Sequence, residues 1–302
     1  MISMIRKKKI HLFSFTALMG ILLFSFVMPT AASADAVAGE TVVTLGQDLT
    51  PQQKEQIKQE MGVDNNARVI EVTNQEEHKY LGNYLDASTI GTRALSSAKI
   101  TLADPGTGIK VKTHNITTIT ETMYANALIT AGVKDADVYV TAPMKVSGTA
   151  GLTGIIKAFE TATGQQVSEE QKQVANEEMV RTSELGEKIG DKQKAAEFMM
   201  KVKEEIAKQQ PQTAEEVRDI IVNVAGDLNI NLNDQDINQL TQLMNKFSQL
   251  NIDWDALTSQ VNKLQGQLDK VLNSPETQNF LEQLFAWLSE LWNSIKSALA
   301  SQ

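Results

Sequence analysis

The stretch Ala142–Phe159, APMKVSGTAGLTGIIKAF, separates two kinds of sequence. A β-branched run ends where it begins, glycines follow at positions 148, 151 and 154, and an apolar helical pattern starts. Before it, strand-like and helix-like segments alternate, whereas no strand pattern occurs after Pro143. The sequence therefore predicts an α+β protein, with a mixed α/β domain over 40–146 of about five strands and three helices, followed by an all-helical region.

Within the mixed domain, β-branched runs predict strands at 41–45, 68–73 and 136–142, and capping and turn residues predict helices at 51–61, 74–85 and 120–131. Two further strand-like runs, 93–102 and 109–118, flank the turn residues Asp104-Pro105-Gly106-Thr107-Gly108. We interpret these two runs as a β-hairpin.

The helical part divides at Pro211. We expect residues 147–210 to pack on the mixed domain and residues 211–302 to form a helical C-terminal region. Apolar spacing and caps predict helices at 151–162, 191–209, 213–228, 234–250, 253–272 and 276–300. A further helix is expected to begin at Ser168 and to end near Gly186 and Gly190. The amide and acidic residues at 231–236 are interpreted as a turn and a helix cap, because they lack the order of a calcium loop.

The N-terminus has the pattern of an export signal. Basic residues at 6–9 precede an apolar run at 12–28, and small residues at 31–34 close it. We expect cleavage after Ala34, which places the mature protein outside the cell or in the cell envelope. The alternative is that the signal is retained, in which case its apolar run anchors the protein in the membrane.

Composition excludes several classes of function. Residues 1–34 hold four basic and no acidic residues, so the mature chain carries 24 Lys and Arg against 37 Asp and Glu, a formal charge of −13. Such an acidic chain is a poor nucleic-acid binder, because phosphate contacts need a basic surface. The absence of cysteine excludes disulfides, thiolate metal sites, cysteine nucleophiles and a cysteine-linked lipid anchor.

The candidate site residues can be interpreted in more than one way. The glycines at 148, 151 and 154 precede a helix, where backbone N–H groups could bind an anion, but their spacing matches no phosphate-loop motif. We favour close packing of another element on Gly148, Gly151 and Gly154. His78 and His114 are the two mature histidines and lie in no zinc-binding or triad motif, so no metal site and no cofactor is predicted.

The last predicted helix, Glu276–Ala300, has an apolar stripe wider than one core face needs. Its one lysine stands against three glutamates, which disfavours an anionic membrane surface and favours packing or a protein partner. The possible partner face consists of Phe280, Leu284, Trp287, Leu288 and Trp292.

Several long blocks resemble one family. They include VVTLGQDLTPQQ (Val42–Gln53), VIEVTNQEEHKYLGNYL (Val69–Leu85), IGTRALSSAKI (Ile90–Ile100) and VSGTAGLTGIIKAFE at 146–160. These blocks resemble the YpuA-like family of exported proteins of Gram-positive, Bacillus-type bacteria, a domain of unknown function, over about residues 40–272. The resemblance implies an exported protein and assigns no catalytic residue or cofactor.

The leading hypothesis is a non-enzymatic exported protein that binds an envelope protein or a wall polymer. The rival is a hydrolase of wall polymer or peptide, metal-assisted through His78 and His114. A third hypothesis is a protein lying on the membrane surface through Glu276–Ala300.

Overall fold

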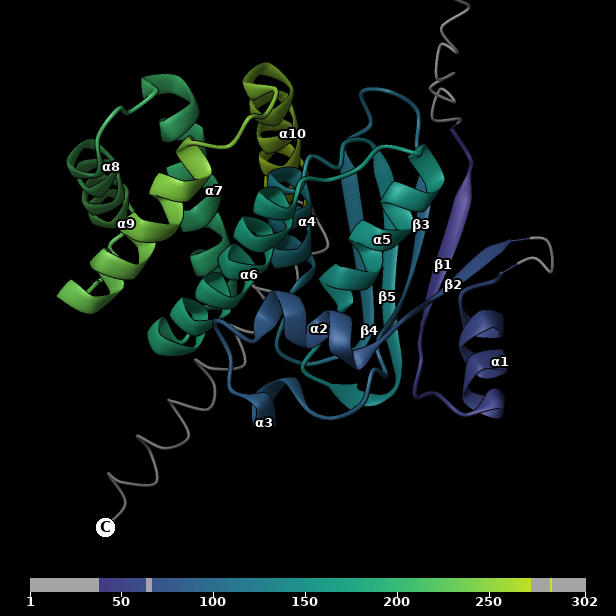
Figure 1. The fold of residues 1–302 in the computed structure, drawn as a ribbon. Helices are drawn as coiled ribbons and strands as arrows, with labels where there is room; N and C mark the ends of the chain where they lie inside the picture. Colours follow the sequence, from purple (N-terminus) through teal and green to yellow (C-terminus); the bar gives the residue numbers. More distant parts are fainter. Residues whose placement is uncertain (1–37, 64–66, 273–282, 284–302) are drawn as a thin grey trace, which may run out of the picture. The chain divides into compact units, whose positions relative to one another are not determined.

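Five β-branched segments form one mixed sheet, as the computed structural model of the chain shows (Figure 1). The structure describes residues 38–63, 67–272 and 283. The predicted signal at 1–34 and the last helix with its partner face lie outside this part. The strands are β1 (Thr41–Gly46), β2 (Arg68–Val72), β3 (Ser97–Leu102), β4 (Ile109–Ile116) and β5 (Ala136–Val146).

The sheet order is β2-β1-β3-β5-β4. β1 and β2 are parallel and are connected through α1 (Pro51–Glu60), β3 is antiparallel to both β1 and β5, and β4 is parallel to β5. With its helical second part, the chain has the α+β class predicted from the sequence.

The predicted hairpin is wrong, because β5 lies between β3 and β4. Val138 pairs with Ile100 on one side and with Val111 on the other. The turn itself is present, since Thr107 N donates to Asp104 O at 3.2 Å, and Gly106 and Gly108 have φ values of +93° and +80°. The turn residues thus reverse the chain, but the burial of β5, the more apolar strand, decides which strand lies beside β3.

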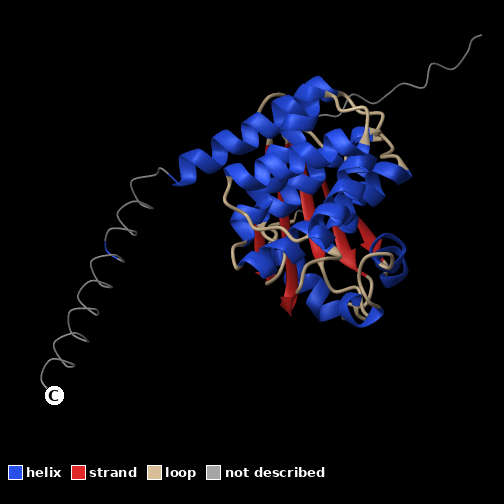
Figure 2. Cartoon of the chain, turned by 90° about the vertical axis from the view of Figure 1, so that its left-hand side faces the viewer, coloured by secondary structure: helices blue, strands red, loops and turns tan. Residues whose placement is uncertain are grey.

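Almost all helices lie on one side of the sheet. α5 (Gly151–Thr163) contacts β1, β2 and β3, α4 (Glu121–Thr130) contacts β4, and α2 (Asn74–Leu81) lies beside α5 (Figure 1). Figure 2, turned to the helical side, shows the strands behind this layer. The remaining helices are α3 (Ala87–Ile90), α6 (Glu169–Ile189), α7 (Lys192–Gln209), α8 (Ala214–Asp227), α9 (Asp234–Ser248) and α10 (Trp254–Leu272). The sheet and these helices share one continuous apolar core, and within the described ranges no helix has the length and apolar character needed to cross a bilayer.

Helix caps follow the sequence closely. Capping boxes begin α1 at Thr50, α6 at Ser168 and α8 at Thr213, and Asn233 caps α9 as the predicted turn and cap at 231–236 require. The cap of α2 is Thr73, one residue before the predicted position. Some bounds differ from those predicted: α2 ends at Leu81 rather than at 85, β3 begins at Ser97 rather than at 93, and β5 continues past Pro143 to Val146. The short α3 had no expected counterpart.

The glycines at 148, 151 and 154 are close-packing positions. A Cβ atom on Gly151 would lie 2.5 Å from Tyr124 Oη and 2.9 Å from Val140 Cγ1, and one on Gly154 would lie 2.8 Å from Thr44 Oγ1. Gly148 has a φ of +90°, and its carbonyl accepts a short hydrogen bond from the fully buried Tyr124 hydroxyl. The segment is therefore filled by protein, and α5 lies directly against the sheet.

Gly151→Ala should lower the free energy of unfolding by about 1–3 kcal/mol, because the new methyl overlaps Tyr124 and Val140. The matched control is Gly226→Ala in α8, where nothing lies within 4 Å of the added Cβ and the lost backbone entropy of the unfolded chain should stabilise by about 0.4–1 kcal/mol. Urea unfolding measures both variants. Equal effects of the two substitutions would contradict the close contact at Gly151.

An ion pair is buried between three helices. Lys203 Nζ of α7 lies 2.7 Å from Glu178 Oε1 of α6, and both side chains are at most 1% exposed. The ammonium also donates to Asn126 O and Thr130 Oγ1 of α4 at 2.9 and 3.2 Å. Burial lowers the pKa of Lys203, while Glu178 opposes that shift. The three bonds satisfy the ammonium and align α4, α6 and α7 at one point.

Lys203→Met should destabilise the protein by about 3–5 kcal/mol, because the Glu178 carboxylate is left buried without its cation. Adding Glu178→Leu should recover part of the loss, since two apolar side chains leave no unpaired charge. Chemical denaturation of the single and double variants tests this. A double variant less stable than Lys203→Met alone would show that the pair is not the source of the loss.

Candidate functional site

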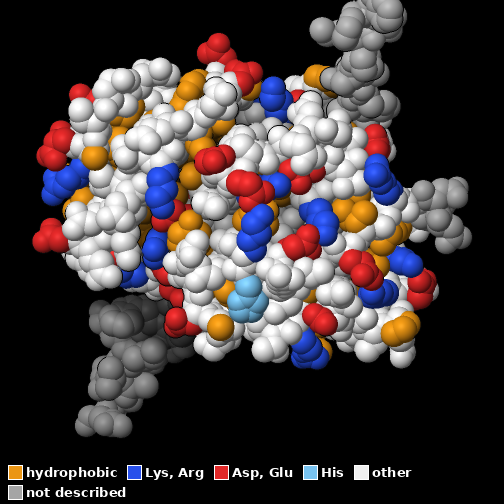
Figure 3. All heavy atoms as spheres, viewed as in Figure 1, with side chains coloured by type: hydrophobic (Ala, Val, Ile, Leu, Met, Phe, Trp, Pro, Cys, Tyr) orange, Lys and Arg blue, Asp and Glu red, His pale blue; other side chains and the backbone are white. Residues whose placement is uncertain are grey.

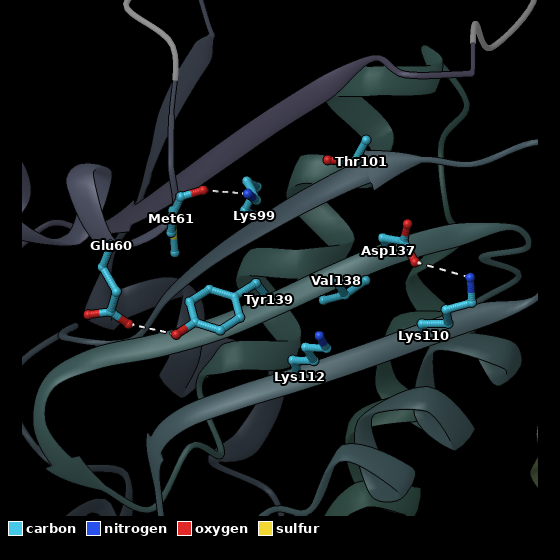
Figure 4. Close-up of a pocket in the computed structure, with 9 residues that line it drawn as sticks. All are labelled: Glu60, Met61, Lys99, Thr101, Lys110, Lys112, Asp137, Val138 and Tyr139. Atoms are coloured by element: carbon cyan, nitrogen blue, oxygen red, sulfur yellow. Dashed lines mark hydrogen bonds and ion pairs between the residues drawn. The ribbon is translucent and has the colours of Figure 1, made fainter. Parts of the chain in front are cut away.

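The side of the sheet opposite α5 is largely open. Val43 and Leu45 of β1 pack there against Leu49 and against Ile57 and Met61 at α1, and this small cluster covers only one part of the sheet. Beyond it, β3, β5 and β4 form the floor of a groove of about 580 Å³ (Figure 4). Strand alternation fills this floor with polar side chains, because residues of opposite parity face the core. The groove is lined by Glu60, Met61, Lys99, Thr101, Lys110, Lys112, Asp137, Val138 and Tyr139.

Three lysines give the groove its cationic character. Lys99 comes from β3 and donates to the Met61 carbonyl, and Lys110 of β4 lies 3.9 Å from Asp137 Oδ1 of β5. Lys112, the next outward residue of β4, is joined to none of the other residues drawn in Figure 4. The groove thus presents three cations and two carboxylates, those of Glu60 and Asp137, in a chain whose formal net charge is −9.

One carboxylate oxygen organises the end of the groove near α1. Glu60 Oε1 accepts from Thr141 Oγ1 at 2.7 Å, from Tyr139 Oη at 2.8 Å and from His114 Nδ1 at 2.9 Å. Burial acts to raise the pKa of Glu60, but the hydrogen bonds from Thr141, Tyr139 and His114 outweigh it and hold the pKa below its ordinary value. Burial and the bond to Glu60 raise the pKa of Tyr139 to about 12. Glu60 is therefore an ionised acceptor that fixes residues of β4 and β5 against the end of α1.

His114 lies on this open face, with its side chain 54% exposed. Its Nδ1 is 2.9 Å from Glu60 Oε1 and 3.4 Å from Thr141 Oγ1. A nucleophile relay needs the carboxylate and the hydroxyl on opposite ring nitrogens, so this arrangement is not a Ser/His/Asp type of triad. What it provides is an oriented imidazole whose Nε2 is not used by Glu60.

His78 has a separate set of partners. It lies on α2, which packs beside α5 on the covered face, and its Nε2 is 2.9 Å from the carbonyl of Gly91. The structure therefore does not bring His78 and His114 to one site. Throughout the described part of the chain, no group of three or more His, Cys, Asp or Glu side chains is arranged to hold a metal ion.

Sequence reasoning found only part of this groove. In the sequence, Lys110, Lys112 and His114 alternate with Ile109, Val111 and Thr113, which is the pattern of a strand with one face in water. Glu60 and Tyr139 carried no local signal, because they meet only after α1 and β5 have packed.

Comparison with known proteins identifies the family. The family described as "Protein of unknown function (DUF1002)" matches residues 45–264. The chain belongs to this family. It is 47% identical over 272 residues to "Uncharacterized protein YpuA" of Bacillus subtilis (strain 168), an alignment that covers 90% of this chain and 93% of that protein. The YpuA-like resemblance is therefore confirmed. No solved structure matches the chain.

A buried carboxyl adjoins His78 in the same helix. Glu77 is 1% exposed and accepts from Asn74 Nδ2 at 2.9 Å. Burial raises the pKa of Glu77 to about 7, and the charges of Asp48 and Glu76 act in the same direction. Its neighbour differs: burial acts to raise the pKa of Glu76, but bonds from Lys157 and Thr73 outweigh it and lower the pKa.

These opposite shifts predict opposite pH dependences. A raised folded-state pKa stabilises the protein below the unfolded value of 4.5, and this contribution is lost as the pH rises through about 7. Glu77→Gln should therefore raise Tm relative to wild type at about pH 8, with the gain vanishing near pH 4.5. Glu76→Gln, the matched control, should lower Tm at about pH 8 and lose its effect in acid. Thermal melts across this range measure both, and parallel profiles would contradict the assignment.

Proposed function

We propose that this protein is exported and acts as a non-enzymatic binding protein of the cell envelope or the surrounding medium, with the open sheet face as its ligand surface. The export pattern at 1–34 supports the location. The absence of cysteine fits a protein that is released or held by non-covalent contacts rather than by a lipid on cysteine.

The observation that carries the proposal is the row of lysines on the open face. Lys99, Lys110 and Lys112 come from two strands and face the same groove, although the chain as a whole is acidic. A ligand that carries spaced negative charges would find several cations along its length, while the net charge of the protein would repel it elsewhere. We therefore assign the groove to an anionic wall polymer that bears phosphate or carboxylate groups.

The groove also suits an extended ligand in its other properties. Its floor crosses β3, β5 and β4, with Asp137 and Tyr139 of β5 between the lysines of β3 and β4 (Figure 4). The Tyr139 hydroxyl already donates to Glu60, so the lysine ammonium groups are the donors that a polymer would meet here. The oriented imidazole of His114 lies at the same end as Glu60 and would add a further polar contact.

The rival hydrolase draws less support from the contacts. A metal-assisted reaction through His78 and His114 would need both imidazoles at one ion, and their partners lie on opposite sides of the sheet. The pair of Glu60 and His114 is the one feature that favours a reaction, because a carboxylate-held imidazole can act as a general base. Release of soluble fragments from purified cell walls, abolished in His114→Ala, would favour hydrolysis over simple binding.

Replacing Lys99, Lys110 and Lys112 by glutamine should weaken binding to purified Bacillus subtilis cell walls at least about tenfold, because three charge contacts are lost. The control replaces Lys188, Lys201 and Lys208, three helical lysines outside the groove, with the same charge change. Cosedimentation at increasing salt measures the affinity, which should fall with ionic strength for the wild type and the control. Equal binding by the two triple variants, or no binding by the wild type, would refute the assignment.

A further inference from the structure

The outward side chains of the open groove lie in register across its three strands. Tyr139 of β5 pairs with Lys99 of β3 on one side and with Lys112 of β4 on the other. Adjacent strands are about 4.8 Å apart, so the Cα atoms of the two lysines are about 10 Å apart, with that of Tyr139 midway. Read from β3 to β4, the central row of the groove is therefore a cation, an aromatic ring and a second cation.

The charges along β5 have the opposite sign. Asp137 stands two residues before Tyr139 and lines the same groove, and beyond the ring Glu60 Oε1 accepts from the Tyr139 hydroxyl at 2.8 Å. Anionic groups laid along β5 would meet a carboxylate on each side of the ring, whereas anionic groups laid across the strands meet Lys99 and Lys112. Charge complementarity therefore gives the direction of the ligand, which crosses the strands over Tyr139.

The ring of Tyr139 is held in one position. It packs against the small apolar cluster beside α1, and Glu60 fixes its hydroxyl. Figure 4 shows the ring face-on over the sheet. Burial and the bond to Glu60 raise the pKa of Tyr139 to about 12, so the ring stays uncharged at neutral pH. The face of an aromatic ring is partly negative and attracts C–H groups, which sugar rings present on their flat faces. Tyr139 is thus a fixed, neutral platform between two cations.

Lysine and tyrosine also meet on the helix-covered side of the molecule, but the charge there is already paired. Figure 3 shows acidic and basic side chains interspersed over this side. Lys79 Nζ and Tyr80 Oη both donate to Glu169, at 2.6 and 3.2 Å. In the groove, by contrast, Lys99 donates to a backbone carbonyl, and Lys112 contacts none of the other residues drawn in Figure 4. Neither of these two cations is paired with another residue of the groove that carries a negative charge, so both can bind anions of a ligand.

We propose that the ligand of the groove is an anionic polysaccharide that crosses the strands, with one sugar ring stacked on Tyr139 and the anionic groups on either side of that ring bound by Lys99 and Lys112. This inference rests on the proposed function of the groove and narrows it to polymers in which sugar rings separate the anionic groups. A polymer of phosphate alone or an acidic peptide supplies the charges without the ring. The anionic groups are phosphodiesters or carboxylates, since an ammonium binds either.

The test measures binding to the mature chain, from Asp35 to Gln302, by isothermal titration calorimetry at an ionic strength of about 0.15 M. Hyaluronate and phosphomannan carry carboxylates and phosphodiesters, respectively, that are separated by sugar rings. Poly-L-glutamate and polyphosphate carry the same two kinds of charge without sugar rings. At least one of the two polysaccharides should bind, and which one binds distinguishes carboxylate from phosphate. Binding of neither polysaccharide would overturn the inference.

Tyr139→Leu supplies the residue-specific arm. It removes the platform, so the affinity for the polysaccharide should fall about threefold to tenfold, while any affinity for polyphosphate or poly-L-glutamate should not change. Tyr139→Phe restores the ring without the hydroxyl and should recover most of the lost affinity. The matched control is Tyr80→Leu in α2, whose hydroxyl is also held by a glutamate but lies on the helix-covered side. This control should bind like the wild type.

A measurement on the wild type does not depend on how well the variants fold. In saturation-transfer NMR, irradiation of the aromatic protons should reach the ring protons of the bound polysaccharide and should fail to do so in the presence of excess unlabelled cell-wall polymer. Wild-type polysaccharide affinity in Tyr139→Leu, or an equal loss for polymers with and without sugar rings, would overturn the inference. If the triple lysine variant loses wall binding and Tyr139→Leu does not, the proposed function stands and the inference about the sugar ring alone is refuted.

Discussion

The approach of α5 to the sheet is the contact on which the arrangement depends. Gly151 and Gly154 remove the side chains that would hold the helix away from β1 and β5, and the space is filled by Tyr124, Val140 and Thr44. Tyr124 is fully buried, yet its hydroxyl is satisfied by the Gly148 carbonyl. One glycine-rich segment therefore joins α4, α5 and the sheet, and the Tyr124 hydroxyl buried beside it is paired.

This contact has a consequence for both sides of the sheet. Because α5 and α4 cover one face, the later described helices stack on them, and among the described helices α1 alone packs on the opposite face. The uncovered positions of β3, β5 and β4 must then be compatible with water, and they carry lysine, threonine, aspartate and tyrosine. The cationic groove is thus a product of one-sided packing, and its polarity alone does not require a ligand. The concentration of lysines within an acidic chain is what does require an explanation.

Features that depend on residues close together in the sequence could be predicted, whereas features that depend on residues far apart could not. Caps at Thr50, Ser168 and Thr213 involve residues three apart, so the sequence predicted them correctly. The predicted hairpin was wrong because the turn at 104–108 determines only that the chain reverses its direction. The order of the strands depends on burying β5, which comes later in the chain. The site residues follow the same logic. His114 was visible as an outward residue, but its contact with Glu60 joins positions 54 apart and needed the folded chain.

The two sides of the sheet pose different physical problems. In the open groove every charged group is near water, so electrostatic attraction there is screened by salt and favours a ligand that makes many contacts. Between α2, α5 and α6, by contrast, Asn176 Oδ1 and Thr153 Oγ1 are buried without a partner among the described residues, which costs free energy in the folded state. A long polymer held by many weak contacts therefore suits the groove. Both situations follow from the same glycine-mediated contact, because the position of α5 leaves the groove open behind the sheet and buries Thr153 in front of it.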